Sequence, residues 1–130
     1  MSDEQEWFER LLDQQLRANP GIWKMLEGHG VTERTPLRLC FIYLAPGEAQ
    51  ARRLVDFIQA ETDYELEARE QDKGRLAKSE WVVAGATQPT AVTRETIDSW
   101  VQWMVAAGAA EGPCAFDGWT VELPDELAAG

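Results

Sequence analysis

Imidazole and thiol groups, which act as general bases, nucleophiles and metal ligands, are scarce in this chain, whereas carboxylates are so plentiful that pairs of them arise by chance. His29 is its only histidine and lies between Gly28 and Gly30, where a helix is expected to end. Cys40 and Cys114 belong to no Cys-x-x-Cys or Cys/His cluster, so neither a zinc site nor a disulfide framework is expected. The sequence offers no Ser/His/Asp or Cys/His arrangement for nucleophilic catalysis and no glycine-rich phosphate loop. It therefore predicts no catalytic residue, no metal and no cofactor.

The most unusual polar group is Asp117, which precedes Gly118 and Trp119 inside a mostly apolar run. A glycine within a strand often marks a β-bulge or the close approach of another backbone. We expect the Asp117 side chain to bond nearby backbone, and a binding or catalytic role is the alternative. We interpret Asp117 and Gly118 as a bulge that sets the direction of Trp119. That indole then either anchors an interface or belongs to the core.

The net charge of the chain limits the classes of molecule that it can bind. The chain carries 23 acidic and 12 basic residues, for a net charge of −11. Direct binding of nucleic acid needs a basic footprint, so it is not expected, and neither is adhesion to an anionic membrane. A strongly acidic domain attracts basic protein partners at long range, or is acidic only for solubility. Six tryptophans add possible interface anchors.

Length and composition predict a single domain located in the cytoplasm. The 130 residues, of which 45% are hydrophobic, suffice for one core. Residues 1–6 are acidic and lack the basic region of a signal peptide, and no apolar run is long enough to cross a bilayer. We expect residues 1–30 to form a helical extension, 36–124 the folded core and 125–130 a tail.

The extension is predicted to contain two helices. Apolar residues recur every three or four positions between residues 5 and 18. Asn19 and Pro20 then have the character of an N-cap and of the first residue of a second helix. This shorter helix carries Trp23 and ends near Gly28.

From residue 36 onward, strand and helix patterns alternate. Helices are expected to begin at Pro46 and to run from an N-cap at Thr93 to Gly108. The first strand is almost continuously apolar, which is typical of a strand buried on both faces. A turn at 71–75 would join the middle two strands in a hairpin. The four expected strands are 37–44, 64–69, 76–86 and 115–123.

This β-α-β-β-α-β order predicts a ferredoxin-like α+β sandwich with an antiparallel four-stranded sheet. Right-handed crossovers place both helices on one face of that sheet. The expected strand order is 4-1-3-2, which makes the apolar first strand central. It also puts the charged second strand at an edge, where charges discourage unwanted pairing. The extension would cover the open face of the sheet or pack at one end of the sandwich.

Two short motifs lie on or beside the second and fourth expected strands. They are Asp63-Tyr64-Glu65-Leu66 and Phe116-Asp117-Gly118-Trp119-Thr120. They resemble the "GYEV"-like and near-terminal "YDGWG" strands of the ribonuclease E inhibitor family called regulator of ribonuclease activity B. The resemblance covers residues 37–123. The chain departs from the family pattern in its tryptophan-bearing extension, in Thr120 and in the long connection from Gly85 to Thr90.

The resemblance implies a small acidic protein that is not an enzyme and that lowers the activity of endoribonuclease E by protein contact. The basic scaffold region of such a ribonuclease would suit a partner of net charge −11. We therefore expect a regulator that binds a basic protein segment. The alternative is a small-ligand-binding or hydrolytic domain with its site near Asp117 and Trp119. The candidate interface residues are Asp117, Gly118, Trp119, Tyr64 and Trp23.

Overall fold

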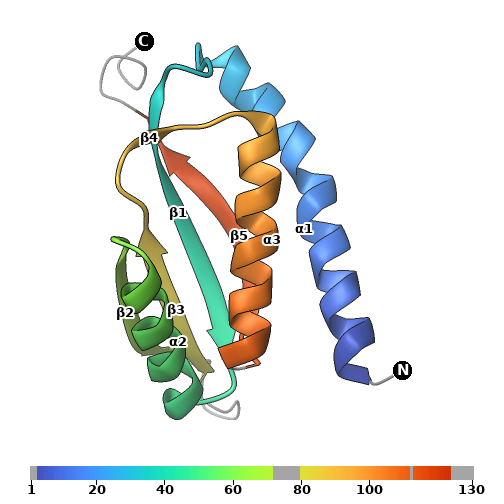
Figure 1. Cartoon of the computed structure of the whole chain (residues 1–130), viewed down its shortest axis with the longest axis vertical. Coiled ribbons are helices and arrows are strands. Elements are labelled where there is room, and N and C mark those ends of the chain that lie inside the picture. The colour runs from blue at the N-terminus through green and yellow to red at the C-terminus, as the bar shows by residue number, and fades with distance from the viewer. Residues whose placement is uncertain (1–2, 72–79, 112, 124–130) are drawn as a thin grey trace.

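The computed structural model describes residues 3–71, 80–111 and 113–123 (Figure 1). Within these ranges the chain is an α+β protein with three helices and an antiparallel sheet of five strands. No helix among the described residues is both long and apolar enough to cross a membrane. The elements are α1 (Asp3–Gly28), β1 (Pro36–Ala45), α2 (Glu48–Glu61), β2 (Glu65–Gln71), β3 (Glu80–Ala86), β4 (Thr90–Ala91), α3 (Arg94–Glu111) and β5 (Ala115–Glu122).

The sheet is built around β1. One edge of β1 pairs with β3 and the other with β5, while β2 pairs with the far edge of β3. β1 is thus interior and β2 lies at an edge, as its charged side chains predict. The expected turn at 71–75 lies outside the described residues apart from Gln71, which ends β2. The tail at 125–130 lies outside them as well.

A short strand that the sequence did not predict, β4, follows β3 along β1. It pairs Thr90 with Leu37. Between β3 and β4 the buried Thr87 bonds to Leu39 in two ways: its N–H donates to the Leu39 carbonyl at 2.9 Å, and its Oγ1 accepts from the Leu39 N–H at 3.1 Å. The hydroxyl thereby takes the place of a ladder carbonyl. A two-residue strand is too short to show an alternating pattern in the sequence, and Pro89 just before it suggests a break, so β4 was not predicted.

The N-terminal residues form one helix and not the two that were expected. α1 continues through Pro20, although an interior proline costs a helix about 3 kcal/mol. Apolar residues on both sides of Pro20 are buried or half-buried against the core, among them Leu16 and Trp23. This packing offsets the cost of the proline. Asn19 is not an N-cap but a buried interior residue of the helix.

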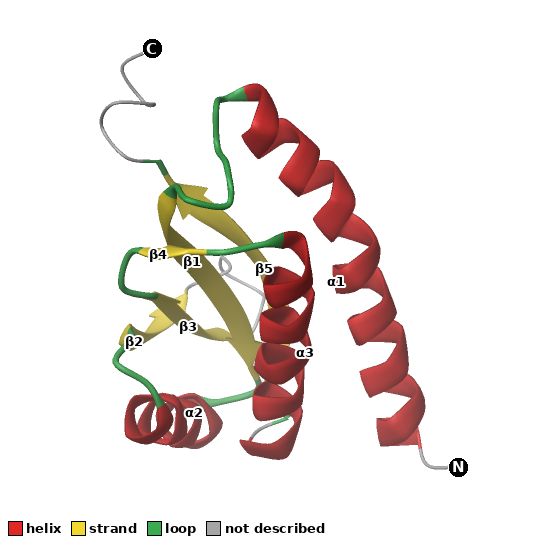
Figure 2. Cartoon of the chain, turned by 45° about the horizontal axis from the view of Figure 1, so that its top comes forward, coloured by secondary structure: helices red, strands yellow, loops and turns green. Residues whose placement is uncertain are grey.

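α1 lies beside α3 and along the β5 side of the sheet, whereas α2 and α3 cover one face (Figures 1 and 2). Gln15 on α1 donates a hydrogen bond from Nε2 to the carbonyl of Phe116 at 3.3 Å. α1 therefore helps to satisfy the backbone of β5 and does not extend over the opposite face. We call the sheet face that lies opposite α2 and α3 the outer face.

Full burial along β1 is confined to one face, whereas its apolar sequence predicted burial on both faces. Leu37, Leu39, Phe41 and Tyr43 point toward the helices and are buried. The intervening residues face outward, and Ile42 is 40% exposed. Arg38, Cys40 and Leu44 on the outer side are half-buried, so burial there is less complete than on the helix side, where α2 and α3 pack. The outer face is the first candidate for a functional surface.

The other two helices each differ from their sequence signals at one end: α2 at its start and α3 at its end. α2 begins at Glu48 with Gly47 as its N-cap, two residues after Pro46. α3 begins as predicted, because Thr93 Oγ1 accepts the Thr96 N–H at 3.2 Å while the Thr93 N–H donates to Thr96 Oγ1 at 2.7 Å. α3 does not end at Gly108 but continues to Glu111. Gly108 serves a close contact with the sheet and is not a stop signal.

Candidate functional site

β5 contains the predicted bulge. Ile42 pairs with Gly118 and Tyr43 with Phe116, so Asp117 is the extra residue on β5. Gly118 has a φ of +124°, a conformation that L side chains rarely adopt. The Asp117 side chain is exposed and makes no hydrogen bond to any other described residue. The expected bond from this carboxylate to nearby backbone is therefore absent, and the bulge rests on Gly118.

The bulge turns Trp119 into the core. Trp119 is 9% exposed, and its ring lies edge-on to Trp100 with centroids 6.1 Å apart. Its Nε1 donates to Oδ1 of Asn19 at 2.9 Å, and Nδ2 of Asn19 donates to Oδ1 of Asp98 at 2.8 Å. Of the two roles that the sequence left open for Trp119, interface anchor or core residue, burial supports the second.

The other candidate interface residues lie in different surroundings. Trp23 is buried on α1, and Tyr64 is half-buried just before β2. Tyr64 accepts a hydrogen bond from Trp100 Nε1 at 3.1 Å, so Trp100 contacts both Tyr64 and Trp119. Among the five candidates only Asp117 is classed as exposed. A partner that approaches the folded chain would first meet other residues.

Exposed acidic residues recur at every second position on and just before β2. From Asp63 onward, exposed residues alternate with half-buried ones, so Asp63, Glu65 and Glu67 lie on one side while Tyr64 and Leu66 pack toward the core. We call these three carboxylates the acidic row. Within β2, extended backbone places Glu65 and Glu67 roughly 6.6 Å apart, and Asp63 lies just before the strand. The row was visible in the sequence as acidic residues at every second position, a pattern that strand alternation alone explained.

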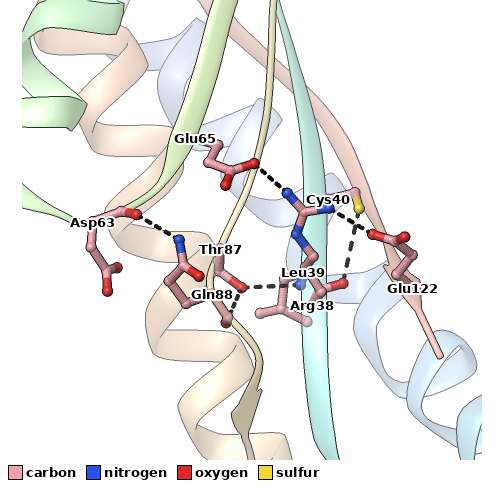
Figure 3. A network of polar contacts seen from close by, with 8 residues as sticks. All are labelled: Arg38, Leu39, Cys40, Asp63, Glu65, Thr87, Gln88 and Glu122. Carbon is pink, nitrogen blue, oxygen red and sulfur yellow. Dashed lines mark hydrogen bonds and ion pairs between the residues drawn. The ribbon is translucent and has the colours of Figure 1, made fainter. Parts of the chain in front are cut away.

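Arg38 connects the acidic row to β5 across the outer face (Figure 3). Its Nη2 lies 2.6 Å from Oε2 of Glu65 and its Nη1 lies 2.9 Å from Oε2 of Glu122. The hydrogen bond to Glu122 and the nearby Glu65 charge raise the pKa of the Arg38 guanidinium. Its side chain is 34% exposed. One arginine therefore faces two carboxylates directly, and Nη1 of Arg69 lies 3.7 Å from Oε1 of Glu67, so Asp63 is the member of the acidic row with no ion pair among the described residues.

A shallow depression of about 320 Å³ lies between this arginine and the acidic row. Its floor is formed by the small residues of β3, and Arg38, Glu65 and Glu67 form part of its wall. Gly85 must be glycine, because a Cβ there would lie 2.5 Å from the carbonyl oxygen of Glu65 and 2.8 Å from the ring of Phe41. The outer face therefore combines a hollow of small residues with a negative rim. The floor residues are Ala84, Gly85 and Ala86.

The described residues offer no reacting group at this surface. Burial raises the pKa of the Cys40 thiol, and it raises that of Cys114 to about 11. Both cysteines are free and favour the unreactive thiol form at neutral pH. The described ranges contain no cluster of three or more His, Cys, Asp or Glu that could hold a metal ion. What the surface offers is charge, shape and one exposed apolar side chain, Ile42.

Comparison of this chain with protein-family models and with curated proteins finds no match.

Proposed function

We propose that the protein is a non-enzymatic cytoplasmic regulator that binds a basic protein segment on the outer face of its sheet and thereby modulates the partner's activity. The observation that carries this proposal is that the acidic row and the exposed Ile42 are presented on one side of the sheet, with β3 between β2 and β1. A row of carboxylates on the same side as an apolar side chain suits a partner that brings both positive charge and apolar contact.

Whole-molecule charge favours the same kind of partner. A net charge of −11 attracts a basic segment over distances longer than a hydrogen bond. The spacing of the acidic row then determines how the bound segment aligns with β2. A basic segment in extended conformation presents alternate side chains roughly 6.6 Å apart, which is the spacing of Glu65 and Glu67 within β2. The hollow over Ala84 and Ala86 leaves room for a side chain of the partner.

The motif resemblance narrows the class of partner. Tyr64 and the Asp117-Gly118-Trp119 stretch resemble the ribonuclease E inhibitor family, so a basic region of an endoribonuclease is the first partner to test. Neither motif supplies the acidic row as a whole. In the motif at 116–120, Gly118 and Trp119 stabilise the fold. In the motif at 63–66, Asp63 and Glu65 belong to the acidic row and would contact the basic partner.

We also infer that the core is a ferredoxin-like sandwich with strand order 4-1-3-2. Supporting this inference, β1 pairs with β5 and with β3, and β3 pairs with β2. β5 then takes the place of the fourth strand. The short β4 and the helix α1 are additions to that pattern.

We do not propose the alternative, a ligand-binding or hydrolytic site near Asp117 and Trp119. The Trp119 indole is 9% exposed, and its only N–H is already bonded to Asn19. Asp117 has no other titratable side chain bonded to it among the described residues. In the described part of the chain, no base is bonded to the Asp117 carboxylate.

Binding of a purified basic segment tests the proposal. The variant Asp63→Asn/Glu65→Gln/Glu67→Gln removes the acidic row while keeping its shape. Exposed ion pairs contribute up to about 1 kcal/mol each, so we expect about tenfold weaker binding in fluorescence anisotropy. Affinity of the unaltered chain should also fall steeply between low and high salt.

A matched control separates local from overall charge. Glu6→Gln/Glu9→Gln/Asp13→Asn changes the net charge equally but on the exposed side of α1. It should weaken binding much less than loss of the acidic row does. Equal losses would show that only net charge matters, and salt-independent binding or none at all would contradict the proposal.

A further inference from the structure

A second hollow lies at the end of the sheet, next to the first member of the acidic row. Its volume is about 490 Å³, which lies within the range of small-ligand and side-chain pockets. It opens between the residues that precede β2, the connection from β3 to α3, and the first turns of α3. Its lining includes Leu39, Asp63, Tyr64, Ala91, Val92 and Trp100.

One part of the lining is aromatic and rigid. Trp100 Nε1 donates to the Tyr64 hydroxyl at 3.1 Å, and both rings pack around Phe41, with centroids 6.1 Å and 5.9 Å from it. The Tyr64 oxygen keeps a lone pair, and its hydrogen has no acceptor among the described residues. The rings are therefore held in place before any occupant arrives.

The mouth of the hollow carries a negative charge. Asp63 lines it, and its carboxylate pairs with no cation in the described part of the chain. The main chain at Asp63 is held, because its carbonyl accepts a hydrogen bond from Gln88 Nε2 at 3.1 Å (Figure 3). Burial raises the pKa of the Tyr64 hydroxyl, against the lowering effect of the hydrogen bond from Trp100, and the neighbouring Asp63 charge also raises it.

These groups together select one kind of side chain. An anion is repelled by Asp63, and a neutral aromatic occupant would gain nothing from that exposed carboxylate. A lysine ammonium is a compact and strongly hydrated charge. An arginine guanidinium is planar, more weakly hydrated, packs against aromatic rings and bonds carboxylates.

We propose that this hollow, lined by Tyr64 and Trp100 and flanked by Asp63, receives an arginine side chain of the basic segment that lies along the acidic row. The inference rests on the proposed function and adds to it a specific anchor residue. Because Asp63 is the first member of the acidic row, a chain in register with Glu65 and Glu67 places one alternate side chain at the mouth of the hollow. That position requires arginine, while the others accept lysine.

Two probe peptides of equal charge test the anchor. One carries three arginines separated by single serines, and the other has three lysines at the same positions. The unaltered chain should bind the arginine peptide about tenfold more tightly, because a weakly hydrated, planar guanidinium gains more from a contact with aromatic rings than an ammonium does. Isothermal titration calorimetry at constant ionic strength gives both dissociation constants.

Three variants test whether the preference for arginine over lysine arises at this hollow. Ala91→Trp places a bulky ring at an exposed lining residue and should bring the arginine-to-lysine affinity ratio down to about one. Ala49→Trp, on the exposed surface of α2, is the control and should keep the ratio. Asp63→Asn alters no buried residue and should reduce arginine binding more than lysine binding.

The outcomes separate the two claims. A ratio that collapses in Ala91→Trp and Asp63→Asn but not in Ala49→Trp supports the arginine pocket. Equal affinity of both peptides for the unaltered chain overturns the pocket and leaves the acidic row standing. If neither peptide binds, the pocket and the proposed function both fail.

Discussion

Asn19 joins three elements through one side chain. It lies on α1, accepts from Trp119 on β5 and donates to Asp98 on α3. The side chain is 4% exposed, so either bond, if lost, leaves a buried polar group without a partner. Its sequence context, Asn followed by Pro, predicted a helix N-cap instead. The same residue type fits both roles, and only the tertiary contacts decide between them.

Replacing Asn19 by serine distinguishes these two roles. Serine is as good an N-cap as asparagine, but it is too short to bridge Trp119 and Asp98. We expect Asn19→Ser to lower the free energy of unfolding by about 1–3 kcal/mol in urea denaturation. Gln14→Ala, at an exposed position of the same helix, should change it by less than about 0.5 kcal/mol. A serine variant as stable as the parent would restore the N-cap interpretation.

At the scale of elements, the contact between α3 and the sheet depends on a glycine inside the helix. A Cβ at Gly108 would lie 2.5 Å from the carbonyl oxygen of Cys114 and 2.7 Å from the ring of Tyr43. The Cys114 N–H donates to the Gly108 carbonyl at 2.8 Å, and the Tyr43 hydroxyl donates to the Met104 carbonyl at 2.7 Å. The absence of a side chain at Gly108 therefore allows α3 to approach Tyr43 of β1 this closely.

Gly108→Ala should destabilise the fold even though alanine favours helices. Overpacking in a filled core costs typically 1–3 kcal/mol, which exceeds the gain of about 1 kcal/mol in helix propensity. Thermal unfolding followed by circular dichroism checks the sign. Gly21→Ala is the matched control, because nothing lies within 4 Å of the added Cβ on α1, and it should stabilise the chain. If both alanines stabilised it, the close contact would be wrong.

Local patterns predicted most elements of the fold, and tertiary packing decided the exceptions. The bulge at Asp117, the N-cap at Thr93 and the edge position of β2 follow from glycine conformation, hydroxyl capping and charge alternation, which act within a few residues. The continuous helix through Pro20 depends on α3 and β5, far away in sequence. β4 depends on Leu37 as its pairing partner. No local pattern carries that information.

The candidate site was predicted less well than the fold, for a physical reason. Trp119 is conspicuous in sequence because the bulge sequence Asp117-Gly118 precedes it, but the bulge serves to bury it. Glu67 and Ile42 are inconspicuous, since acidic residues on an edge strand and an isoleucine on a central strand are common. Their exposure on one face becomes visible only when the sheet is assembled and its outer face is free of the described helices.

At the scale of the whole molecule, charge and architecture divide the surface. Helices cover one face of the sheet, and α1 runs along the β5 side (Figure 1). On the outer face Arg38 lies between Glu65 and Glu122 (Figure 3), and Glu67 and Ile42 are exposed there as well. A net charge of −11 draws a basic partner toward the protein as a whole. The acidic row then defines where that partner rests. The central claim is that binding is localised to this face.

Chemical-shift mapping of the full-length chain with the three-arginine peptide tests that claim most directly. The account predicts that amide shifts concentrate on the outer face of β1 and β2, at Arg38, Ile42, Glu65 and Glu67, and extend to the Trp100 indole N–H. Exposed residues of α1, such as Glu9, should not shift. Shifts spread evenly over all acidic residues, or centred on α1, would contradict it.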